Sequence, residues 1–429
     1  MTVGTTTGSA GGTGGGRVSR RAALAAAVVA AVPAGAAGPG RRAAAQGTPV
    51  AAGADDDRAA AILALARKAF AEEQLQALLV RVVENGAEVA TLALGESMPG
   101  VPATPAMRVR NGAVAFSYLA LLLLRYVDQG RCGLDDPVGR WLPDLPHADA
   151  VTLRMLASMT SGYPDYVPDA GFDREIYADP FRQWRPEELV AIGLRQGQRF
   201  APGTSFEYSH TNFVVLGRAL EAIGVGPLDT LMRREVLGPL GLRDTVNSDT
   251  PAIPEPVLHV LSGERKQALG VPAATRFVEE STYWSPSWTT AQGAIQSTTI
   301  ADMTATAIAV GEGTLLTPES HAAMTTPLPD GFGRKIDGCA ACFAVDARFN
   351  YGLGLVLQGP WQLQNPAFAA CEGIEAYLPA RRLALAVVAT YRQEVWDAAG
   401  TNTRSRADER LCAALSALLA PESPLTGPK

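Results

Sequence analysis

The side chains best suited to proton transfer stand close together at Tyr208-Ser209-His210. Without a neighbouring ammonium to favour its phenolate, Tyr208 is expected to be a hydrogen-bonding group rather than a base, and His210 could bind a ligand or respond to pH. A serine hydroxyl needs a base before it can attack a carbonyl, and a lysine three positions later on a helix would supply one. The sequence has no Ser-x-x-Lys, because none of its lysines (Lys68, Lys266, Lys335 and Lys429) follows a serine at that spacing.

The same residues also have structural interpretations, which the sequence leaves open. Tyr208 could be a packing residue that bridges two parts of the fold, and His210 could be satisfied by structural hydrogen bonds. Ser117 has no base near it in sequence and is predicted to be a core or helix-capping hydroxyl. Ser161 is predicted to be a turn residue, and Ser209, between Tyr208 and His210, could be turned away from the cleft. Paired carboxylates suited to hydrolysis are not evident.

Five cysteines include one close pair, Cys339-Ala340-Ala341-Cys342. A local disulfide is the simplest interpretation in an oxidising compartment. A redox pair is the alternative, but such a pair is expected at a helix N-terminus rather than in a Gly/Asp-rich loop. Structural zinc would need four ligands, and no second Cys/His pair supplies them. We therefore predict neither a metal nor a cofactor.

The chain has 429 residues, of which 47% are hydrophobic, and a formal net charge of −6. That length is enough for one large domain with a substantial core. No basic run or basic stripe with interleaved aromatic residues occurs, so we predict no nucleic-acid partner. The sequence does not indicate an oligomeric state.

Residues 1–45 are predicted to be an export signal. A Gly/Thr-rich opening leads to Ser19-Arg20-Arg21 and an apolar run from Ala22 to Val32, which is too short to span a bilayer. The paired arginines resemble a twin-arginine signal, and small residues allow cleavage after Ala36 or Ala45. The mature protein would be secreted or held in the cell envelope. A disordered cytoplasmic N-terminal tail is the alternative.

Hydrophobic patterns place strands at both ends of the chain and helices between them. Apolar alternation over Leu78–Val83 and Val89–Leu94, joined at Asn85-Gly86, predicts a hairpin. The run Ala113–Val127 is hydrophobic nearly all round, which is typical of a buried helix. Further predicted elements are a surface helix at 55–75, a helix beginning near Thr211, strands at 351–357, 374–378 and 383–391, and a final helix at 407–419.

These elements predict an α+β fold over residues 55–420. One antiparallel sheet would be assembled from both ends of the chain and flanked by helices. A mostly helical second lobe would cover about 134–290. A cleft between the two lobes is where a small-molecule or peptide ligand is expected.

The motifs, taken in order, resemble the serine β-lactamase, D-alanyl-D-alanine peptidase and esterase family of the class C β-lactamase-related type. The resemblance runs from about Asp55 to the C-terminus. It rests on the hairpin, the buried helix, Leu134-Asp135-Asp136-Pro137, Trp141-Leu142-Pro143, Thr160 to Pro164, Pro202 to Ser209, Tyr351-Gly352-Leu353-Gly354 and a closing strand after Pro379. It implies a penicillin-binding-protein-like fold and an acyl-transfer site.

The resemblance also implies three catalytic motifs, and each departs from the family pattern. The serine position falls on Ala113 and the lysine position on Phe116; a shifted register would put Asn111 and Val114 there instead. Neither register supplies a nucleophile or a base. The second family motif is Tyr-x-Asn. This sequence keeps the tyrosine as Tyr208 and has His210 at the asparagine position.

The third motif, Lys or His followed by any residue and Gly, aligns with Gln364-Asn365-Pro366. Gln364 cannot supply a positive charge, and Pro366 lacks an N–H and is tolerated only at a strand edge or bulge. A competing register puts Cys371-Glu372-Gly373 there, and it also lacks the pattern.

The sequence therefore predicts an exported, catalytically inactive relative of these hydrolases that binds a peptidoglycan-like or acylated ligand. Tyr208, His210 and Asn365 are the predicted ligand contacts. One alternative is an active esterase or amidase that uses a relocated nucleophile. Another is a structural or partner-binding envelope protein, which would expose a large apolar patch.

Overall fold

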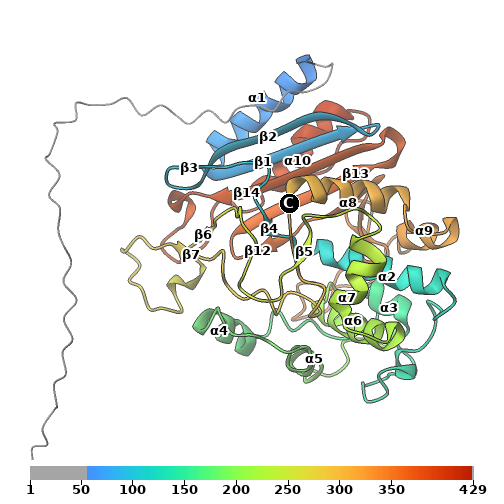
Figure 1. Ribbon diagram of the computed structural model, residues 1–429. Helices are drawn as coiled ribbons and strands as arrows, with labels where there is room; N and C mark the ends of the chain where they lie inside the picture. Colours follow the sequence, from blue (N-terminus) through green and yellow to red (C-terminus); the bar gives the residue numbers. More distant parts are fainter. Residues whose placement is uncertain (1–55, 428–429) are drawn as a thin grey trace, which may run out of the picture. The chain divides into compact units, whose positions relative to one another are not determined.

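Both ends of the described chain build one antiparallel sheet (Figure 1). The structure is a computed structural model that describes residues 56–427. The nine-stranded sheet has the order β3-β2-β1-β14-β13-β11-β10-β9, with β12 paired to β13 outside that path. Its strands are β1 (Leu75–Glu84), β2 (Ala87–Met98), β3 (Val101–Pro102), β9 (Asn350–Tyr351), β10 (Val356–Gln358), β11 (Trp361–Gln364), β12 (Ala367–Phe368), β13 (Cys371–Leu378) and β14 (Leu383–Tyr391).

The first hairpin forms where the sequence predicts it. Asn85 and Gly86 both have positive φ, 53° and 77°, as a two-residue turn between twisted antiparallel strands requires. β1 then pairs with β14, from Glu84 opposite Leu383 to Leu75 opposite Tyr391. All nine residues of β14 are buried, because this central strand is covered on both faces.

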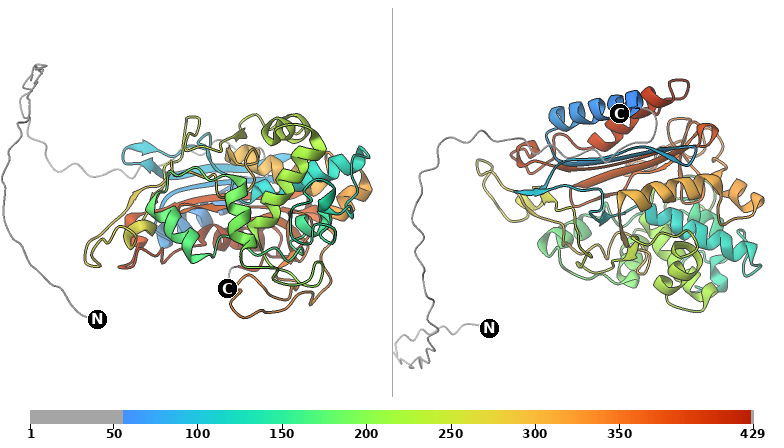
Figure 2. Two further views of the ribbon diagram at one scale, coloured as in Figure 1. Left: turned by 90° about the horizontal axis from the view of Figure 1, so that it is seen from below. Right: turned by 45° about the horizontal axis from the view of Figure 1, so that its top comes forward.

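Helices cover the two faces of the sheet. α1 (Asp56–Glu72) and α10 (Ala407–Leu419) contact each other and pack on one face, as the blue and red helices of Figure 2 show. α8 (Ile300–Glu312) packs against β1, β13 and β14 on the other face. This arrangement agrees with the predicted α+β class.

Beyond α8 lies a layer of helices around α2 (Val114–Asp128). Twelve of the 15 residues of α2 are buried, because α6 (His210–Gly224) and other helices surround it. The other helices are α3 (Leu153–Ala157), α4 (Ala170–Ala178), α5 (Pro186–Leu194), α7 (Leu228–Met232) and α9 (Pro318–Thr325), with short turns η1 (Val138–Arg140), η2 (Arg233–Leu237), η3 (Glu264–Lys266), η4 (Pro379–Arg381) and η5 (Gln393–Val395).

Two details differ from the sequence-based expectations. The expected strand 351–357 is two short strands, β9 and β10, because the chain turns at Gly354, whose φ is +61°. The expected helical stretch 134–290 also contains strands. Within it, β6 (Leu261–Ser262) pairs with β7 (Glu279–Glu280), and β5 (Val246–Asn247) pairs with β8 (Gln296–Thr298), which lies just after it. β8 also pairs with β4 (Val109–Arg110), which lies before it.

The described residues 56–427 fall within one compact unit, so the helical layer and the sheet are not separate domains. The predicted export signal at residues 1–45 lies outside the described residues. Within residues 56–427, every helix is too short or too polar to cross a membrane.

Candidate functional site

Helix α2 begins at the position where the resemblance places the nucleophile. Ala113 is the N-cap residue and has no side chain that could cap the helix or attack a carbonyl. The segment before it is held by β4, which pairs with β8, and by a hydrogen bond from the Asn111 backbone N–H to the Gln296 carbonyl at 3.1 Å. The start of α2 is therefore firmly placed, but it carries no nucleophile.

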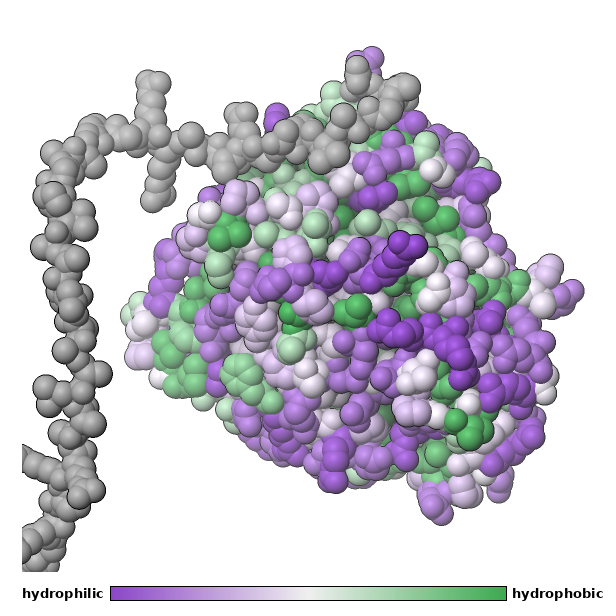
Figure 3. Space-filling model, viewed as in Figure 1, coloured by the Kyte–Doolittle hydropathy of each residue, from purple (hydrophilic) through white to green (hydrophobic). Residues whose placement is uncertain are grey.

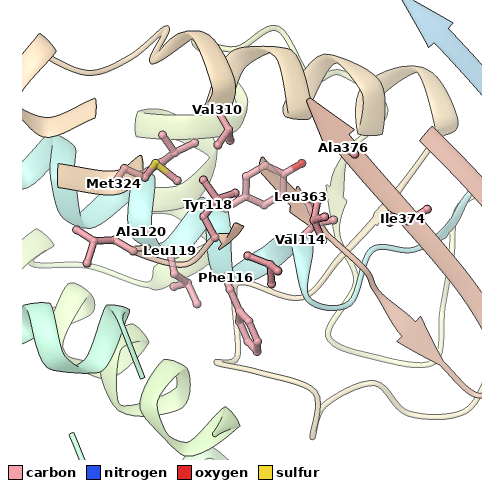
Figure 4. Packing of buried hydrophobic residues seen from close by; sticks show 14 of the residues in the cluster. Val114, Phe116, Tyr118, Leu119, Ala120, Val310, Met324, Leu363, Ile374 and Ala376 are labelled. Carbon is pink, nitrogen blue, oxygen red and sulfur yellow. The ribbon is translucent and has the colours of Figure 1, made fainter. Parts of the chain in front are cut away.

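Phe116 fills the position of the expected base with an aromatic ring. Its side chain is 1% exposed and stacks on Phe213 of α6, with ring centroids 4.1 Å apart. The rings of Tyr208 and His210 lie 6.1 and 5.7 Å away. Figure 4 shows the Phe116 ring pointing away from the strand that carries Ile374. An ammonium group at this position would have to enter an apolar cluster.

The shifted register does not restore the chemistry. Asn111 is 1% exposed and donates from its amide nitrogen to Gln296 Oε1 at 3.4 Å. Val114 is fully buried within the core. Both pairs of candidate positions thus lack a nucleophile and a base.

Tyr208 and His210 lie together beside Phe116, as the second motif predicts. Tyr208 is half-buried, and its ring stands perpendicular to that of Tyr351 at 6.2 Å. Burial, and to a lesser extent the charge of Asp165, raises the pKa of the Tyr208 hydroxyl well above its ordinary value. Tyr208 is therefore a neutral hydrogen-bonding group rather than a base.

His210 is the first residue of α6 and has a carboxylate partner that sequence reasoning missed. Its Nδ1 lies 3.2 Å from both carboxylate oxygens of Asp165, and its backbone N–H donates to Asp165 Oδ1 at 3.1 Å. Asp165 is 5% exposed and also accepts from the Val167 N–H. Forty-five positions separate the pair, so no local spacing in the sequence indicates it.

We expect Asp165→Ala to lower the free energy of unfolding by about 1–3 kcal/mol, because it leaves buried backbone donors without an acceptor. Urea unfolding followed by circular dichroism measures the loss. The control is Asp330→Ala, which removes an exposed carboxylate outside the site and should change stability by less than about 0.5 kcal/mol. Equal effects of the two substitutions would show that Asp165 does not hold the start of α6.

The third segment packs against the start of α2 in the register Gln364-Asn365-Pro366. A Cβ placed on Gly112, whose φ is +40°, would lie 2.8 Å from Pro366 Cβ, so the two backbones are in close contact. The competing segment Cys371-Glu372-Gly373 belongs to the next strand, β13, and the Gly373 N–H donates to the Pro366 carbonyl at 2.8 Å. Pro366 offers no N–H toward Ala113.

The other two residues of this segment point elsewhere. Gln364 is fully buried, and its amide donates to the Gly354 carbonyl at 2.6 Å beneath α2. Asn365 donates to Glu409 of α10 at 3.3 Å. It lines a separate cavity of about 600 Å³ together with C-terminal residues. The structure thus brings Tyr208 and His210 together with Phe116, but it does not bring Asn365 to them.

The three nearby serines are held by structural hydrogen bonds. Ser117 donates to the Gly354 carbonyl at 2.8 Å, Ser209 donates to the Tyr163 carbonyl at 2.9 Å, and Ser161 bonds to the Asn212 side chain. All three are fully buried. None of these three hydroxyls is paired with a base.

The cysteine pair lies beside the second motif. Cys339 and Cys342 form a disulfide with a Cα–Cα distance of 5.4 Å, and the Tyr208 N–H donates to the carbonyl of Ala341 within that loop at 3.2 Å. Glu207 lies within 4.8 Å of both sulfur atoms, but it pairs with Arg199 at 3.3 Å and the sulfurs are bonded to each other. The group therefore offers no thiolate ligand for a metal.

A cavity of about 970 Å³ lies next to the third segment, and the residues of its wall were not predicted from the sequence. It is bounded by α4 and the 284–288 loop on the helical side, and by β12, the start of β13 and residues 396–405 on the sheet side. Aromatic side chains dominate its wall: Tyr177, Trp184, Trp284, Trp288, Phe368 and Trp396. It is the cleft between sheet and helices that the fold predicts.

Aromatic contacts connect His210 to this cavity. The His210 ring lies 6.0 Å from Tyr166, which lies 5.4 Å from Phe172. Phe172 is 6.0 Å from Trp288 in the cavity wall, and Trp288 is 6.0 Å from Phe368 of β12. The second motif and the cavity therefore share one packed aromatic layer.

Comparison with known proteins assigns this arrangement to a family. The family description "Beta-lactamase" matches residues 56–408, which is more than three quarters of the chain. The chain belongs to the β-lactamase family. This family consists of serine hydrolases. In this chain, Ala113 and Phe116 stand at the start of α2.

Curated relatives of this β-lactamase-family chain include peptidases and an esterase. A D-alanyl-D-alanine carboxypeptidase/endopeptidase, AmpH of Escherichia coli, is 28% identical over 40% of this chain and 45% of its own length. Esterase EstB of Burkholderia gladioli is 31% identical over 43% of this chain and 50% of its own length. The chain therefore spans about half the length of these curated relatives.

Solved structures support the same fold. D-amino acid amidase from Ochrobactrum anthropi, in complex with L-phenylalanine amide, superimposes with a TM-score of 0.68 and 21% identity, covering 86% of this chain and 100% of its own. A penicillin-binding protein homologue from Pyrococcus abyssi gives a TM-score of 0.64 and 19% identity, covering 85% and 79%. At these identities the likeness shows the fold of this β-lactamase-family chain, and function has to be argued from its site.

Proposed function

We propose that this protein is an exported, non-catalytic member of the β-lactamase family that binds a peptidoglycan-like peptide or another acylated small molecule. The observation that carries the proposal is the start of α2, where Ala113 replaces the nucleophile and the buried Phe116 ring, stacked on Phe213, replaces the base. Export is proposed from the arginine pair and apolar run of residues 1–45.

Each step of acyl transfer lacks a group in this site. Acylation needs an activated hydroxyl, and Ala113 has none. Stabilising the oxyanion needs N–H donors near the reacting carbonyl, and the segment packed against Gly112 presents Pro366 there. The phenol of Tyr208, whose pKa is raised by burial, does not act as the base. The losses occur at neighbouring positions, as expected after a reaction has been abandoned.

Ligand binding is supported by what the site retains. The cavity of about 970 Å³ has the size of a small-molecule site, and its wall joins the layer that holds Tyr208 and His210. Relatives named as a D-alanyl-D-alanine peptidase and a D-amino acid amidase suggest a peptide or amino acid amide as the ligand. Tyr208 and His210 remain proposed contacts, whereas the Asn365 amide is engaged by Glu409.

The proposal predicts that the purified mature protein forms no covalent adduct with a fluorescent penicillin or a fluorophosphonate. Gel fluorescence and intact-mass measurement would detect less than 1 in about 100 molecules labelled, because no activated hydroxyl is present. A positive control is any active serine hydrolase treated in parallel. An adduct that maps to a residue around α2 or Tyr208 would overturn the proposal.

Reconstruction of the first motif is a second arm of this experiment. The double variant Ala113→Ser/Phe116→Lys should remain unlabelled. Gln364 supplies no positive charge and Pro366 supplies no N–H donor to stabilise the reaction intermediate. Rapid labelling of this variant would show that only the first motif has been lost.

An esterase or amidase remains the second candidate, and the His210–Asp165 pair is the observation that favours it. A carboxylate that orients an imidazole is the arrangement of a general base. This candidate predicts hydrolysis of short p-nitrophenyl esters that His210→Ala or Tyr208→Phe abolishes. Esterase activity unaffected by either substitution would come from a contaminant.

The structural or partner-binding candidate has less support. Hydrophobic residues on the face in Figure 3 are scattered among polar ones. In the described part of the chain, the exposed large hydrophobic residues belong to different segments: Val101, Phe181, Val225, Leu269 and Leu418. A docking surface would show them gathered into one patch.

A further inference from the structure

The cavity between α4 and β12 contains a carboxylate that lacks a counter-charge. Glu264, in η3, lines this cavity together with Glu372 of β13. Among residues 56–427, Glu264 forms no ion pair with a lysine, arginine or histidine. Burial, reinforced by the charge of Glu372, raises the pKa of Glu264 to about 7. Tyr177 and Ser262 hydrogen-bond to this carboxyl group, but they leave its charge uncompensated when it is ionised.

Charges around the cavity are also unbalanced. Its acidic residues are Asp173, Asp179, Glu264 and Glu372, and its basic residues are Arg174 and Arg182. Arg182 is paired with Glu175 and Glu188, which lie outside the cavity wall. Glu372 accepts hydrogen bonds from the Ser405 hydroxyl and the Arg406 N–H, both at 2.6 Å, so it keeps its place in the wall. Asp173, Asp179 and Arg174 are exposed, so Glu264 and Glu372 are the half-buried acidic groups of the wall.

The wall itself favours cations. Tryptophan, tyrosine and phenylalanine rings present a negative face to a nearby positive charge. The protein already uses this property, because the guanidinium of Arg182 stacks over the Trp184 ring at 3.7 Å. The ring centroids of Trp288 and Phe368 are 6.0 Å apart, and those of Tyr177 and Trp284 are 6.4 Å apart. These contacts hold the aromatic wall in place before a ligand arrives.

We propose that this cavity binds the protonated amine of a ligand with an apolar or aromatic body, and that Glu264 is the counter-ion of that amine. This inference rests on the proposed function, because it names the chemical class of the ligand for the same cleft. The amine would lie between Glu264 and the aromatic rings, and the apolar body would fill the space toward Trp288 and Phe368.

Other ligand classes fit less well. A carboxylate or phosphate could approach Arg174, which is exposed in the wall, but Glu264 and Glu372 would repel it. A neutral apolar molecule would displace water and leave the Glu264 carboxylate with its hydrogen bonds to Tyr177 and Ser262 but with no counter-charge. A protonated amine compensates the charge and gains the contact with the rings at the same time.

Isothermal titration calorimetry of the mature protein at pH 8, where Glu264 is ionised, tests the proposal with three probes of similar shape. They are 2-phenylethylamine, the neutral 2-phenylethanol and the anionic 3-phenylpropionate. We expect the amine to bind at least about tenfold more tightly than the alcohol, and the carboxylate not to bind. Glu264→Gln should weaken binding of the amine about tenfold and leave binding of the alcohol unchanged.

Two further variants separate charge from shape. Glu319→Gln removes an exposed carboxylate of α9 away from the cavity and should leave all three affinities unchanged. Trp288→Leu removes part of the wall and should weaken the amine and the alcohol together. Equal affinities for amine and alcohol, or an unchanged amine affinity in Glu264→Gln, would overturn the proposal.

A fourth probe distinguishes this inference from the proposed function. N-acetyl-D-alanyl-D-alanine is an acylated peptide without an amine. Binding of this peptide but not of 2-phenylethylamine would reject the cation site and leave the acylated ligand of the proposed function standing. Binding of the amine, together with covalent labelling by penicillin, would reject the non-catalytic proposal and leave the cation site standing. Binding of none of the probes would reject both.

Discussion

Phe116→Ala should lower the free energy of unfolding by about 3–5 kcal/mol, the range for truncating a buried phenylalanine. The ring is 1% exposed, stacks on Phe213 and contacts the rings of Tyr208 and His210, so its removal leaves a cavity between α2 and α6. Urea unfolding followed by circular dichroism, with the transition slope checked for change, gives the value.

Two matched variants support that measurement. Phe181→Ala removes the same side chain where it is 56% exposed, and it should change stability by about 0.5 kcal/mol or less. Phe116→Leu keeps much of the volume and should cost less than the alanine variant. If Phe116→Ala and Phe181→Ala lowered the free energy of unfolding equally, the packing of the Phe116 ring would not stabilise the contact between α2 and α6.

Glu264→Gln should make the protein more stable at high pH, with no change at low pH. The pKa of Glu264 is raised to about 7 in the folded protein, above its ordinary value of 4.5. The stability that the protonated carboxyl contributes is therefore complete below pH 4.5 and is lost as the pH rises toward and through 7. The shift corresponds to about 3 kcal/mol between the two limits. Glutamine stays neutral and avoids this loss.

The measurement is the difference in unfolding free energy between Glu264→Gln and the unaltered protein at pH 4.5, 6 and 8. Comparing the two proteins at each pH cancels the contribution of other titrating groups. Glu319→Gln, which changes an exposed carboxylate, should show a difference that does not vary with pH. A constant difference for Glu264→Gln as well would contradict the raised pKa.

The positions that the family resemblance assigns to the nucleophile and the base are part of the packing. The aromatic ring of Phe116 stacks on Phe213, and Pro366 packs closely against Gly112, the residue before Ala113. Neither replacement is a simple deletion, because each makes new contacts that stabilise the fold. Restoring a serine at position 113 alone would therefore leave the surrounding machinery absent.

Much of the fold could be predicted from local patterns. The turn at Asn85-Gly86, the all-round apolar run that became α2, and the helix at Ala407–Leu419 each depend on neighbouring residues. The prediction of a single strand at 351–357 was wrong, because the chain turns at Gly354. The Gly354 carbonyl accepts hydrogen bonds from the side chains of Ser117 and Gln364. Those partners are distant in sequence, and alternation alone does not reveal them.

The sequence by itself determined the side chains at the first motif, because neither Ala113 nor Phe116 can act as a nucleophile or a base wherever it lies. Tertiary structure decided what stands in their place. The pairing of His210 with Asp165, the contact of Pro366 with Gly112, and the acidic aromatic cavity around Glu264 all join segments far apart in the chain. Such contacts depend on how helices and strands pack in three dimensions, and residue spacing along one sequence does not encode them locally.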